Sequence, residues 1–305
     1  MGIWFAIFAM LFFSTANVTI GRGGKRAKNS NGAFISILIT VLLSCLIWVL
    51  LSLQSGWPAI NLIASAWFAL AGLLTIFVGR VFLYSSIHML GSIRASAIKR
   101  LNPFFSVLLA VLLLGETVTG SMMLGMVLIF SSFALLITHS LNGKPAELPS
   151  GAAPQSGFKT LLNLGYLYGP ISAFAYAAGY VARKQGLILL PDAVLGSLIG
   201  SLVAALFYLV TALFIGKYRS DVRDTFSQVN PWLLAAGIFS SLGQISYFVA
   251  LKYSPISQIA LVTSMEVFVT MFLSVIVFRN KDILTREVML AALLGTTGAV
   301  IVILF

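Results

Sequence analysis

The sequence predicts an all-α integral membrane protein, with about ten transmembrane helices in two inverted five-helix repeats around a central cavity. Its composition is the first reason, because 59% of the 305 residues are hydrophobic, only 9% are charged and the mean hydropathy is +1.03. A soluble domain carries about 25% charged residues. The second reason is a series of apolar segments of about 20 residues, the length that crosses a bilayer. The third is a polar linker near the middle of the chain.

The expected spans follow one another with short connections. Their approximate bounds are 3–20, 33–53, 62–88, 93–114, 121–140, 164–190, 194–215, 231–252, 256–278 and 288–305. None alternates apolar and polar residues, so β-barrel strands are excluded. The first segment lacks the basic start and the cleavage site of a signal peptide, and Ala6 stands where a myristoylation motif needs Ser or Thr. We expect it to be a retained helix.

The linker is the stretch SLNGKPAELPSGAAPQSG at 140–157, where Pro, Gly and Ser cluster. We therefore expect a first repeat over 1–142, a linker over 143–160 and a second repeat over 161–305. A shift of 164 residues aligns polar positions of the two halves, pairing Arg80 with Gln244, His88 with Lys252, Lys99 with Thr263, Asn102 with Glu266 and Ser106 with Thr270. Five spans are an odd number, so the second half is inverted relative to the first, as in many secondary transporters.

Charge and motifs exclude several classes of function. The net charge of +11 results from only eight acidic residues, and the 19 basic residues are scattered, so no nucleic-acid surface is expected. Cys45 is the single cysteine and cannot form an intramolecular disulfide. No zinc-protease motif, nucleophile elbow, carboxylate pair or Walker motif occurs. We expect no enzyme activity, no cofactor, no metal site and no direct use of ATP.

Polar residues inside the spans are the candidates for function. Lys99, Asn102 and Ser106 share one helix face, and Thr263, Glu266 and Thr270 have the same spacing in the second half. Lys99 either extends to the interface or faces the cavity beside Pro103. Glu266 is the only carboxylate within an expected span. It either forms a salt bridge with Lys99 or Arg80 that locks helix packing, or binds a ligand or a proton.

The third span places Arg80, Tyr84 and His88 at four-residue spacing. For Arg80 the alternative is extension to the interface, and His88 is expected near a loop without a catalytic part. Other spans add small polar and tyrosine side chains, which also serve as interface anchors or interhelical bonds. The candidate binding residues are Asn17, Arg80, Tyr84, Lys99, Asn102, Tyr176, Tyr180, Gln244, Tyr247, Thr263, Glu266 and Thr270, with Glu266 also the candidate for proton coupling.

The stretch LGSIRASAIKRLNPFFSVLLAVLLLGE at 90–116 combines small residues, a proline within the helix and a closing Gly-Glu. It resembles the fourth helix of the EamA-type ten-helix carriers of the drug/metabolite transporter superfamily. The stretch LVTSMEVFVTMFLSVIVFRN at 261–280 resembles a degraded copy, with Glu266-Val267 where the family often has Glu-Pro and Arg279-Asn280 where it has Gly-Glu. The resemblance implies a solute exporter or exchanger with a cavity lined by both repeats, but no particular solute.

The balance of charges within the spans indicates the chemical class of the solute. Arg80, Lys99 and Arg183 outnumber Glu266 within the spans, and a buried cation needs an anionic partner. We expect a secondary active or facilitative exporter of a small polar metabolite, such as an amino acid or other carboxylate, that works by alternating access and has protons as a candidate coupling ion. The alternatives are a multidrug or lipophilic-cation efflux carrier and an exchanger of anions or phosphorylated metabolites. The paired polar stripes argue against a purely structural subunit.

The expected location is the inner (plasma) membrane of a bacterium, as a multi-pass monomer or weak homodimer in contact with lipid. Lys and Arg concentrate in loops after odd-numbered spans, as with Arg22, Lys144 and Arg223. By the positive-inside rule this charge distribution places both termini outside. The family resemblance implies both termini inside, so the two lines of reasoning conflict.

Overall fold

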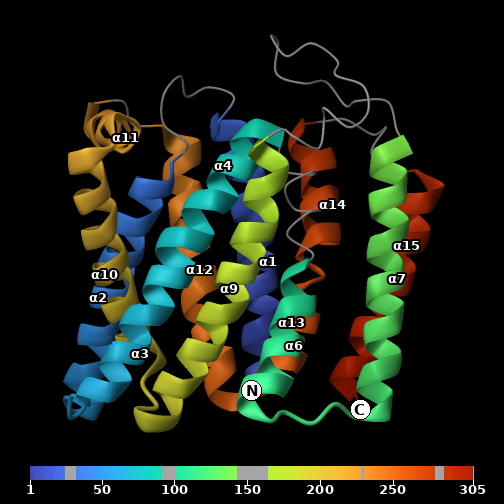
Figure 1. Cartoon of the computed structure of the whole chain (residues 1–305), viewed down its shortest axis with the longest axis horizontal. Coiled ribbons are helices and arrows are strands. Elements are labelled where there is room, and N and C mark those ends of the chain that lie inside the picture. The colour runs from blue at the N-terminus through green and yellow to red at the C-terminus, as the bar shows by residue number, and fades with distance from the viewer. Residues whose placement is uncertain (25–31, 91–100, 143–163, 228–229, 279–284, 305) are drawn as a thin grey trace.

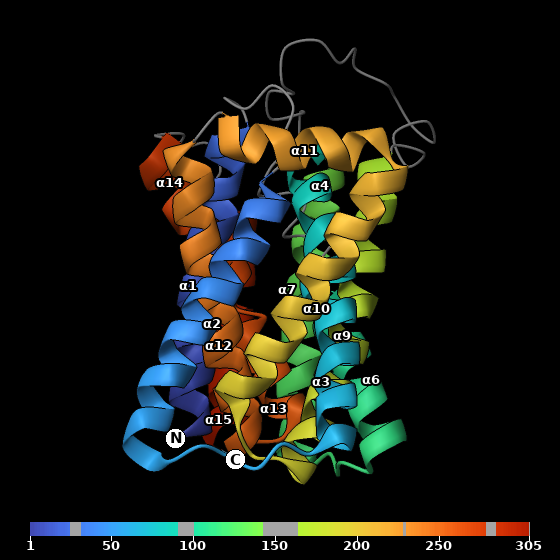
Figure 2. The ribbon, with the colours of Figure 1, turned by 90° about the vertical axis from the view of Figure 1, so that its left-hand side faces the viewer.

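The computed structural model describes residues 1–24, 32–90, 101–142, 164–227, 230–278 and 285–304, and the regular elements in these ranges are helices (Figure 1). The axes of most helices are roughly aligned, so the helices form one bundle. Both termini lie at the same end of it, opposite the short helix α11 (Figures 1 and 2).

The first half begins with α1 and α2, which match the first two expected spans. The third span is continuous but changes type, because a π-helix η1 separates α3 from α4. The described helices of this half are α1 (Gly2–Gly24), α2 (Ala33–Ser55), α3 (Leu62–Gly72), η1 (Leu73–Gly79), α4 (Arg80–Leu90), α6 (Leu101–Leu114) and α7 (Gly120–Asn142).

The second half has the same order of helices. It adds the helix α11, its third span α12 is continuous where the first half has η1, and a break divides its fourth span into α13 and α14. The described helices are α9 (Leu164–Leu189), α10 (Ala193–Phe214), α11 (Gly216–Ser227), α12 (Pro231–Tyr253), α13 (Ile256–Thr263), α14 (Glu266–Phe278) and α15 (Arg286–Leu304).

The predicted all-helical membrane fold is confirmed, since each of the ten expected spans contains a described helix. Seven helical segments in the described ranges are long and apolar enough to cross a membrane, with 62–89 and 256–277 each taken as one. The apolar α6 and 120–135 are shorter. The helix α9 is long, at 26 residues, but carries Arg183 and Lys184. The predicted linker at 143–160 lies outside the described residues.

Several helices start where a side chain can accept hydrogen bonds from the first free backbone amides. Asn61 accepts from Ile63 N and Ala64 N at 3.0 Å, which fixes the start of α3. Asp192 accepts from the backbone N–H of Val194 and Leu195 and starts α10. In α3 and α10 a short polar cap therefore sets the first residue of the span.

The neighbours of each helix support two related halves. The first helix of the first half, α1, packs along α12 of the second half. The equivalent contact is made by α9, the first helix of the second half, with α3 and α4 of the first half. Likewise α1 contacts α14 while α6 contacts α9, and α2 contacts α12 while α10 contacts α3. The pairs α2 with α10, α6 with α13 and α7 with α15 join equivalent helices. Exchanging the halves leaves this pattern unchanged, so the halves are interleaved around one interior.

Glycines allow the closest helix crossings. A Cβ on Gly72 of α3 would lie 2.1 Å from the carbonyl oxygen of Gly200 on α10. Gly125 of α7 and Gly298 of α15 face each other in the same way, each position lying 2.7 Å from the other's carbonyl oxygen. Small residues let membrane helices approach to backbone contact, so these crossings form the rigid scaffold.

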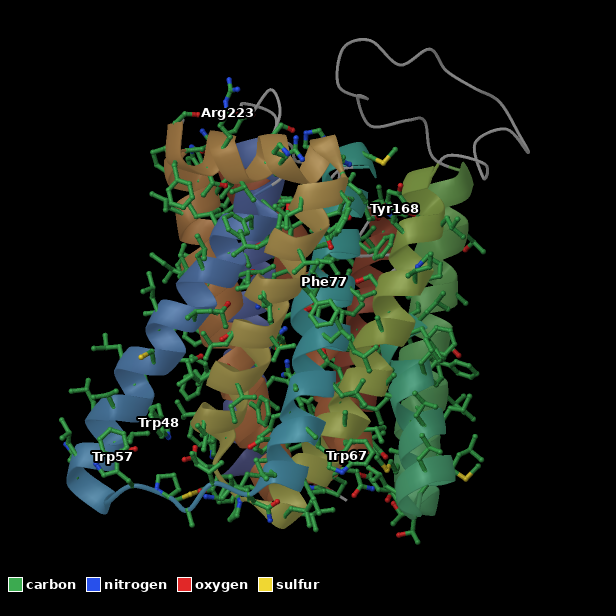
Figure 3. The ribbon with its side chains drawn as sticks, turned by 60° about the vertical axis from the view of Figure 1, so that its left-hand side comes forward. Trp48, Trp57, Trp67, Phe77, Tyr168 and Arg223 are labelled. Atoms are coloured by element: carbon green, nitrogen blue, oxygen red, sulfur yellow. The ribbon has the colours of Figure 1, made fainter. Side chains whose placement is uncertain are left out.

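The two ends of the bundle differ in chemistry. Figure 3 shows Trp48, Trp57 and Trp67 toward one end and Arg223 of α11 at the other. The rings of Trp48 and Trp57 meet edge to face at 5.0 Å, and tryptophans are typical of the membrane interface. The helix α11, which the sequence analysis missed, lies across the bundle at the opposite end, with Arg223 exposed (Figure 2).

Candidate functional site

The break between α13 and α14 lies within the fourth span of the second half. No proline causes it. The hydroxyl of Ser264 donates to Leu261 O at 2.5 Å, and that of Thr263 donates to Ile259 O at 2.8 Å. Such side-chain bonds compete with the helical ladder, and the backbone tightens so that Met265 N donates to Val262 O at 3.2 Å. A new helix then begins at Glu266.

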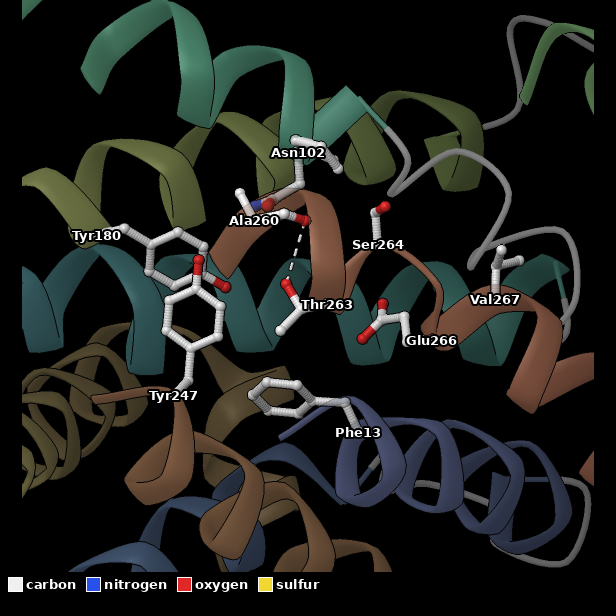
Figure 4. A pocket seen from close by; sticks show the side chains of 10 residues that line it. Phe13, Asn102, Tyr180, Tyr247, Ala260, Thr263, Ser264, Glu266 and Val267 are labelled. Atoms are coloured by element: carbon white, nitrogen blue, oxygen red, sulfur yellow. Dashed lines mark hydrogen bonds between the residues drawn. The ribbon is translucent and has the colours of Figure 1, made fainter. Parts of the chain in front are cut away.

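A pocket with about 380 Å³ of atom-free space, part of it open to solvent, lies beside this break (Figure 4). Its lining comes from both halves of the chain. The lining residues are Phe13, Asn102, Pro103, Tyr180, Tyr247, Ala260, Thr263, Ser264, Glu266 and Val267. The pocket is therefore the place where α1 and α6 of the first half meet α9, α12, α13 and α14 of the second.

Glu266 is held at this pocket by its backbone. Ser14 of α1 donates its hydroxyl proton to Glu266 O at 2.8 Å, across the two halves. The carboxylate is buried and points toward the space between Thr263 and Phe13 (Figure 4). A carboxylate in the middle of a span is costly unless a polar or charged group compensates it.

Two tyrosines form one wall of the pocket. The rings of Tyr180 and Tyr247 stack with centroids 4.1 Å apart and planes at 24°, and Tyr176 follows with its centroid 6.0 Å from Tyr180. All three are buried. Facing them, Asn102 donates to Ala173 O at 3.1 Å and accepts from Ser106 at 3.3 Å. The first half thus contributes an amide that is tied to α9.

Several interior polar atoms lack hydrogen-bond partners within the described part of the chain. They are Nδ2 of Asn17, both amide atoms of Gln244, and the hydroxyls of Thr270 and Ser274. Buried polar atoms are almost always paired, with protein or with water. Water or a polar solute that enters the interior would complete the hydrogen bonds of these atoms.

Arg80 is fully enclosed, with 1% of its surface exposed. Its Nη1 donates to Ser36 O at 2.9 Å, to Ser36 Oγ at 3.0 Å and to Thr40 Oγ1 at 2.6 Å, all on α2. The alternative that Arg80 extends to the interface is therefore wrong: its guanidinium points inward, where the hydroxyls of α2 hold it.

Comparison with known proteins decides the family. The model of the EamA-like transporter family matches residues 1–138 and 163–304, nearly the whole chain in two segments. The chain belongs to the EamA-like transporter family. It is accordingly a multi-pass membrane transporter and not an enzyme. These matched segments agree with the two halves seen in the structure.

A solved crystal structure of another protein aligns with this EamA-like transporter at a TM-score of 0.69. The alignment covers 99% of this chain and 98% of that chain, at 16% sequence identity. At this identity the likeness shows the shared fold alone. No curated protein matches the chain.

In this EamA-like transporter the predicted residues fall into three groups. Asn102, Tyr180, Tyr247, Thr263 and Glu266 line the pocket. The candidates that are buried in the bundle but do not line the pocket are Asn17, Arg80, Tyr84, Tyr176, Gln244 and Thr270. Lys99 lies outside the described residues, so its contact with Glu266 stays a prediction.

Sequence reasoning left several lining residues out of its list. Phe13, Ala260, Ser264 and Val267 line the pocket but carry no charge or distinctive spacing. Ser264 and Val267 lie within a residue or two of Glu266, and adjacency to a helix break could have signalled them. Nothing in the sequence around Phe13 distinguishes it from the other phenylalanines of the spans.

Proposed function

We propose that this transporter is an exporter of a small polar metabolite, such as an amino acid or other carboxylate, by alternating access around the pocket at the α13–α14 break. The carrying observation is that this pocket places Glu266 and two tyrosine rings of the second half around one space with the Asn102 amide of the first half. Secondary transporters commonly bind solute at broken helices between two repeats. We place it in the inner membrane of a bacterium, as a monomer or weak homodimer.

Glu266 has one of two functions in this proposal: it binds the ammonium group of a zwitterion or it carries a coupling proton. Its backbone is positioned by the Ser14 contact and by the start of α14. A coupling carboxylate exchanges its proton with each side of the membrane in turn, as the pocket changes the side to which it opens. Proton coupling then follows the alternation of access.

Alternating access requires contacts that form at one end and break at the other. At the end where α13 begins, Glu116 accepts from Ile256 N at 2.8 Å, from Ser257 N at 3.0 Å and from the Ser257 hydroxyl. Glu116 follows α6 and belongs to the first half, whereas α13 belongs to the second. We infer that these hydrogen bonds of Glu116 break when the two halves move apart at this end.

The test is solute flux in proteoliposomes that contain only the purified protein, with labelled amino acids and carboxylates and an imposed pH gradient. Glu266→Gln should abolish the response of flux to the pH gradient. Glu287→Gln, an exposed carboxylate in the first turn of α15, is the matched control and should transport normally. Unchanged flux and pH response in Glu266→Gln would contradict the coupling role.

A ligand panel identifies the solute class before any flux assay. A ligand at 100 times its dissociation constant stabilises the folded state by about 2.7 kcal/mol, which shifts thermal unfolding measurably. We expect shifts with amino acids or carboxylates. A shift with lipophilic cations alone would replace the proposal with multidrug efflux, and a shift with phosphorylated metabolites alone would replace it with anion exchange.

A further inference from the structure

The bundle contains two buried arginines that do not line the pocket. Arg80 on α4 and Arg183 on α9 are each 1% exposed. Arg183 donates from Nη2 to Thr75 Oγ1 at 2.5 Å, while its Nε and Nη1 have no partner, and Nη2 of Arg80 has none either. Three guanidinium nitrogens are thus buried and unpaired within the described residues.

In the described part of the chain, the hydrogen-bond partners of these two arginines are neutral. They are the hydroxyls of Ser36, Thr40 and Thr75 and the carbonyl of Ser36. The Arg183 guanidinium also lies 4.7 Å from the ring centroid of Phe248 and 5.7 Å from that of Tyr180. Cation–π contacts offset only part of the loss of water. Arginine stays protonated in proteins, so the interior holds two cations. Both are linked to Thr75, whose carbonyl oxygen accepts from the backbone N–H of Arg80 and whose hydroxyl accepts from Arg183.

Among the residues that the structure describes, the acidic side chains offer these arginines little neutralisation. Glu266 alone lies within an expected span, and it lines the pocket. Asp192 caps α10, Glu116 accepts from the start of α13, and Asp221 accepts from Tyr208. Leaving a buried charge without an opposite charge is strongly unfavourable. The missing negative charge is expected to come from a bound anion.

The backbone around the arginines is specialised. Thr75, which accepts from Arg183, lies within the π-helix η1, and Arg80 directly follows this helix. The course of η1 therefore sets the positions of the Thr75 hydroxyl and of the Arg80 side chain. A π-helical turn carries an extra residue and is frequent at functional sites. A Cβ on Gly179 of α9 would lie 2.3 Å from Thr75 Cγ2, which means that α9 can approach η1 only because it has glycine here.

We propose that Arg80 and Arg183 form a buried anion site that takes the acidic group of the solute, a carboxylate or a phosphate, during transport. This inference rests on the proposed function and adds a second binding group to it. The Arg183 guanidinium lies over the ring of Tyr180, and that ring lines the pocket. The Tyr180 side chain must therefore move for a solute in the pocket to reach Arg183.

The first test uses the purified protein in detergent, with inorganic phosphate and acetate as probes at constant ionic strength. Both anions should raise the unfolding temperature of the wild type. In Arg183→Met that response should disappear, and the unfolding temperature without anion should be equal to or above that of the wild type, because an unpaired buried cation has been removed. A merely structural Arg183 predicts the opposite, a lower unfolding temperature and an unchanged anion response.

The neighbouring cation provides the control. Lys184 donates to Leu251 O at 2.8 Å and to Ser254 O at 3.0 Å, so its charge is partnered. Lys184→Met should lower the unfolding temperature and keep the full anion response. Arg183→Lys serves as a second variant that keeps the charge. It should raise the half-effective anion concentration about tenfold, because lysine lacks the planar fork of donors. An unaltered response in Arg183→Lys would overturn the assignment.

Flux separates this inference from the proposed function. If wild-type protein transports an amino acid or carboxylate and Arg183→Met transports it equally well, the anion site is wrong while the transporter proposal stands. If the wild type transports none of the tested solutes but phosphate or acetate still stabilises it through Arg183, the anion site stands and the proposed solute class is wrong.

Discussion

The glycine crossings and the centre of the bundle are both buried, yet they differ in how well their groups are partnered. At Gly72 and Gly200, and at Gly125 and Gly298, backbone meets backbone with no space for a side chain. Around the α13–α14 break and the two arginines, buried amide, hydroxyl and guanidinium atoms lack partners. The crossings hold the fold, and the centre holds groups that a bound solute can complete. Stability and transport should therefore respond to substitutions at different places.

The largest effect is expected at the crossing of α3 and α10. Gly72→Leu places a side chain where the Gly200 backbone lies 2.1 Å away, so the helices must separate. We expect a loss of at least about 3 kcal/mol in the free energy of unfolding, measured by thermal or denaturant unfolding in detergent. Gly120→Ala, at a site with nothing within 4 Å, is the control. A Gly72→Leu protein as stable as that control would break the comparison.

The next largest effect tests a well-partnered polar group between the halves. Glu116→Gln replaces one carboxylate oxygen with an NH₂ group, which then faces either the N–H of Ile256 or the N–H of Ser257 and cannot accept from it. Loss of a helix cap costs about 1–2 kcal/mol. Unfolding should show this decrease, whereas Glu287→Gln on the exposed start of α15 should change stability by less than about 0.5 kcal/mol. Equal effects in both variants would show that Glu116 is not a cap.

A smaller effect concerns pH at α11. Burial raises the pKa of Asp221 to about 6; the Tyr208 hydroxyl, which donates to it at 3.0 Å, and nearby Lys217 lower it, while Asp224 raises it. The unfolded value is about 3.9, so the folded state binds more protons between these values. Stability should therefore increase by about 1 kcal/mol as the pH falls from about 7.5 to 5, and be lost as the pH rises through 6.

Thermal unfolding across this pH range measures the effect, and Asp221→Asn should flatten the profile because the titrating group is gone. The same slope in Asp221→Asn would mean that another group is responsible.

The smallest effect on stability is expected for a buried hydroxyl without a partner among the described residues, and it tests the comparison between partnered and unpartnered groups most directly. Thr270 is buried with its hydroxyl unpartnered, so Thr270→Val should leave the unfolding free energy unchanged or raise it by up to about 1 kcal/mol. Solute flux should fall. Thr40→Val is the matched control, because the Thr40 hydroxyl accepts from Arg80 and is bonded to Ser241 at 2.8 Å. That variant should lose stability; a loss of equal size in Thr270→Val would contradict the distinction.

The spans could be predicted from the sequence because membrane helices need about 20 apolar residues, and seven helical segments of the described residues meet this need. The helix α11 was missed because its sequence, GKYRSDVRDTFS, is charged and short and reads as a loop. The π-helix at Leu73–Gly79 and the break after Thr263 were also missed. Both result from competition between local hydrogen bonds, which hydropathy does not detect.

The candidate site was predicted in part. Spacing placed Asn102, Thr263 and Glu266 on inward faces, and these residues do line the pocket. The same reasoning allowed Arg80 to extend to the interface, because helix position alone does not say whether a long side chain turns inward or outward. The serine and threonine hydroxyls of α2 decide its direction, and that contact spans 44 and 40 residues of sequence.

The interleaving of the halves has a consequence for how the chain is made. The ribosome delivers the first five spans to the bilayer before α9 and α12 exist, yet α1 needs α12 as its neighbour and α3 needs α9. Until then, the polar inner faces of α1 and α4 must be shielded by lipid headgroups, water or an insertion chaperone. The interior closes only when the last third of the protein has been synthesised, so the nascent first half is the form most exposed to quality control.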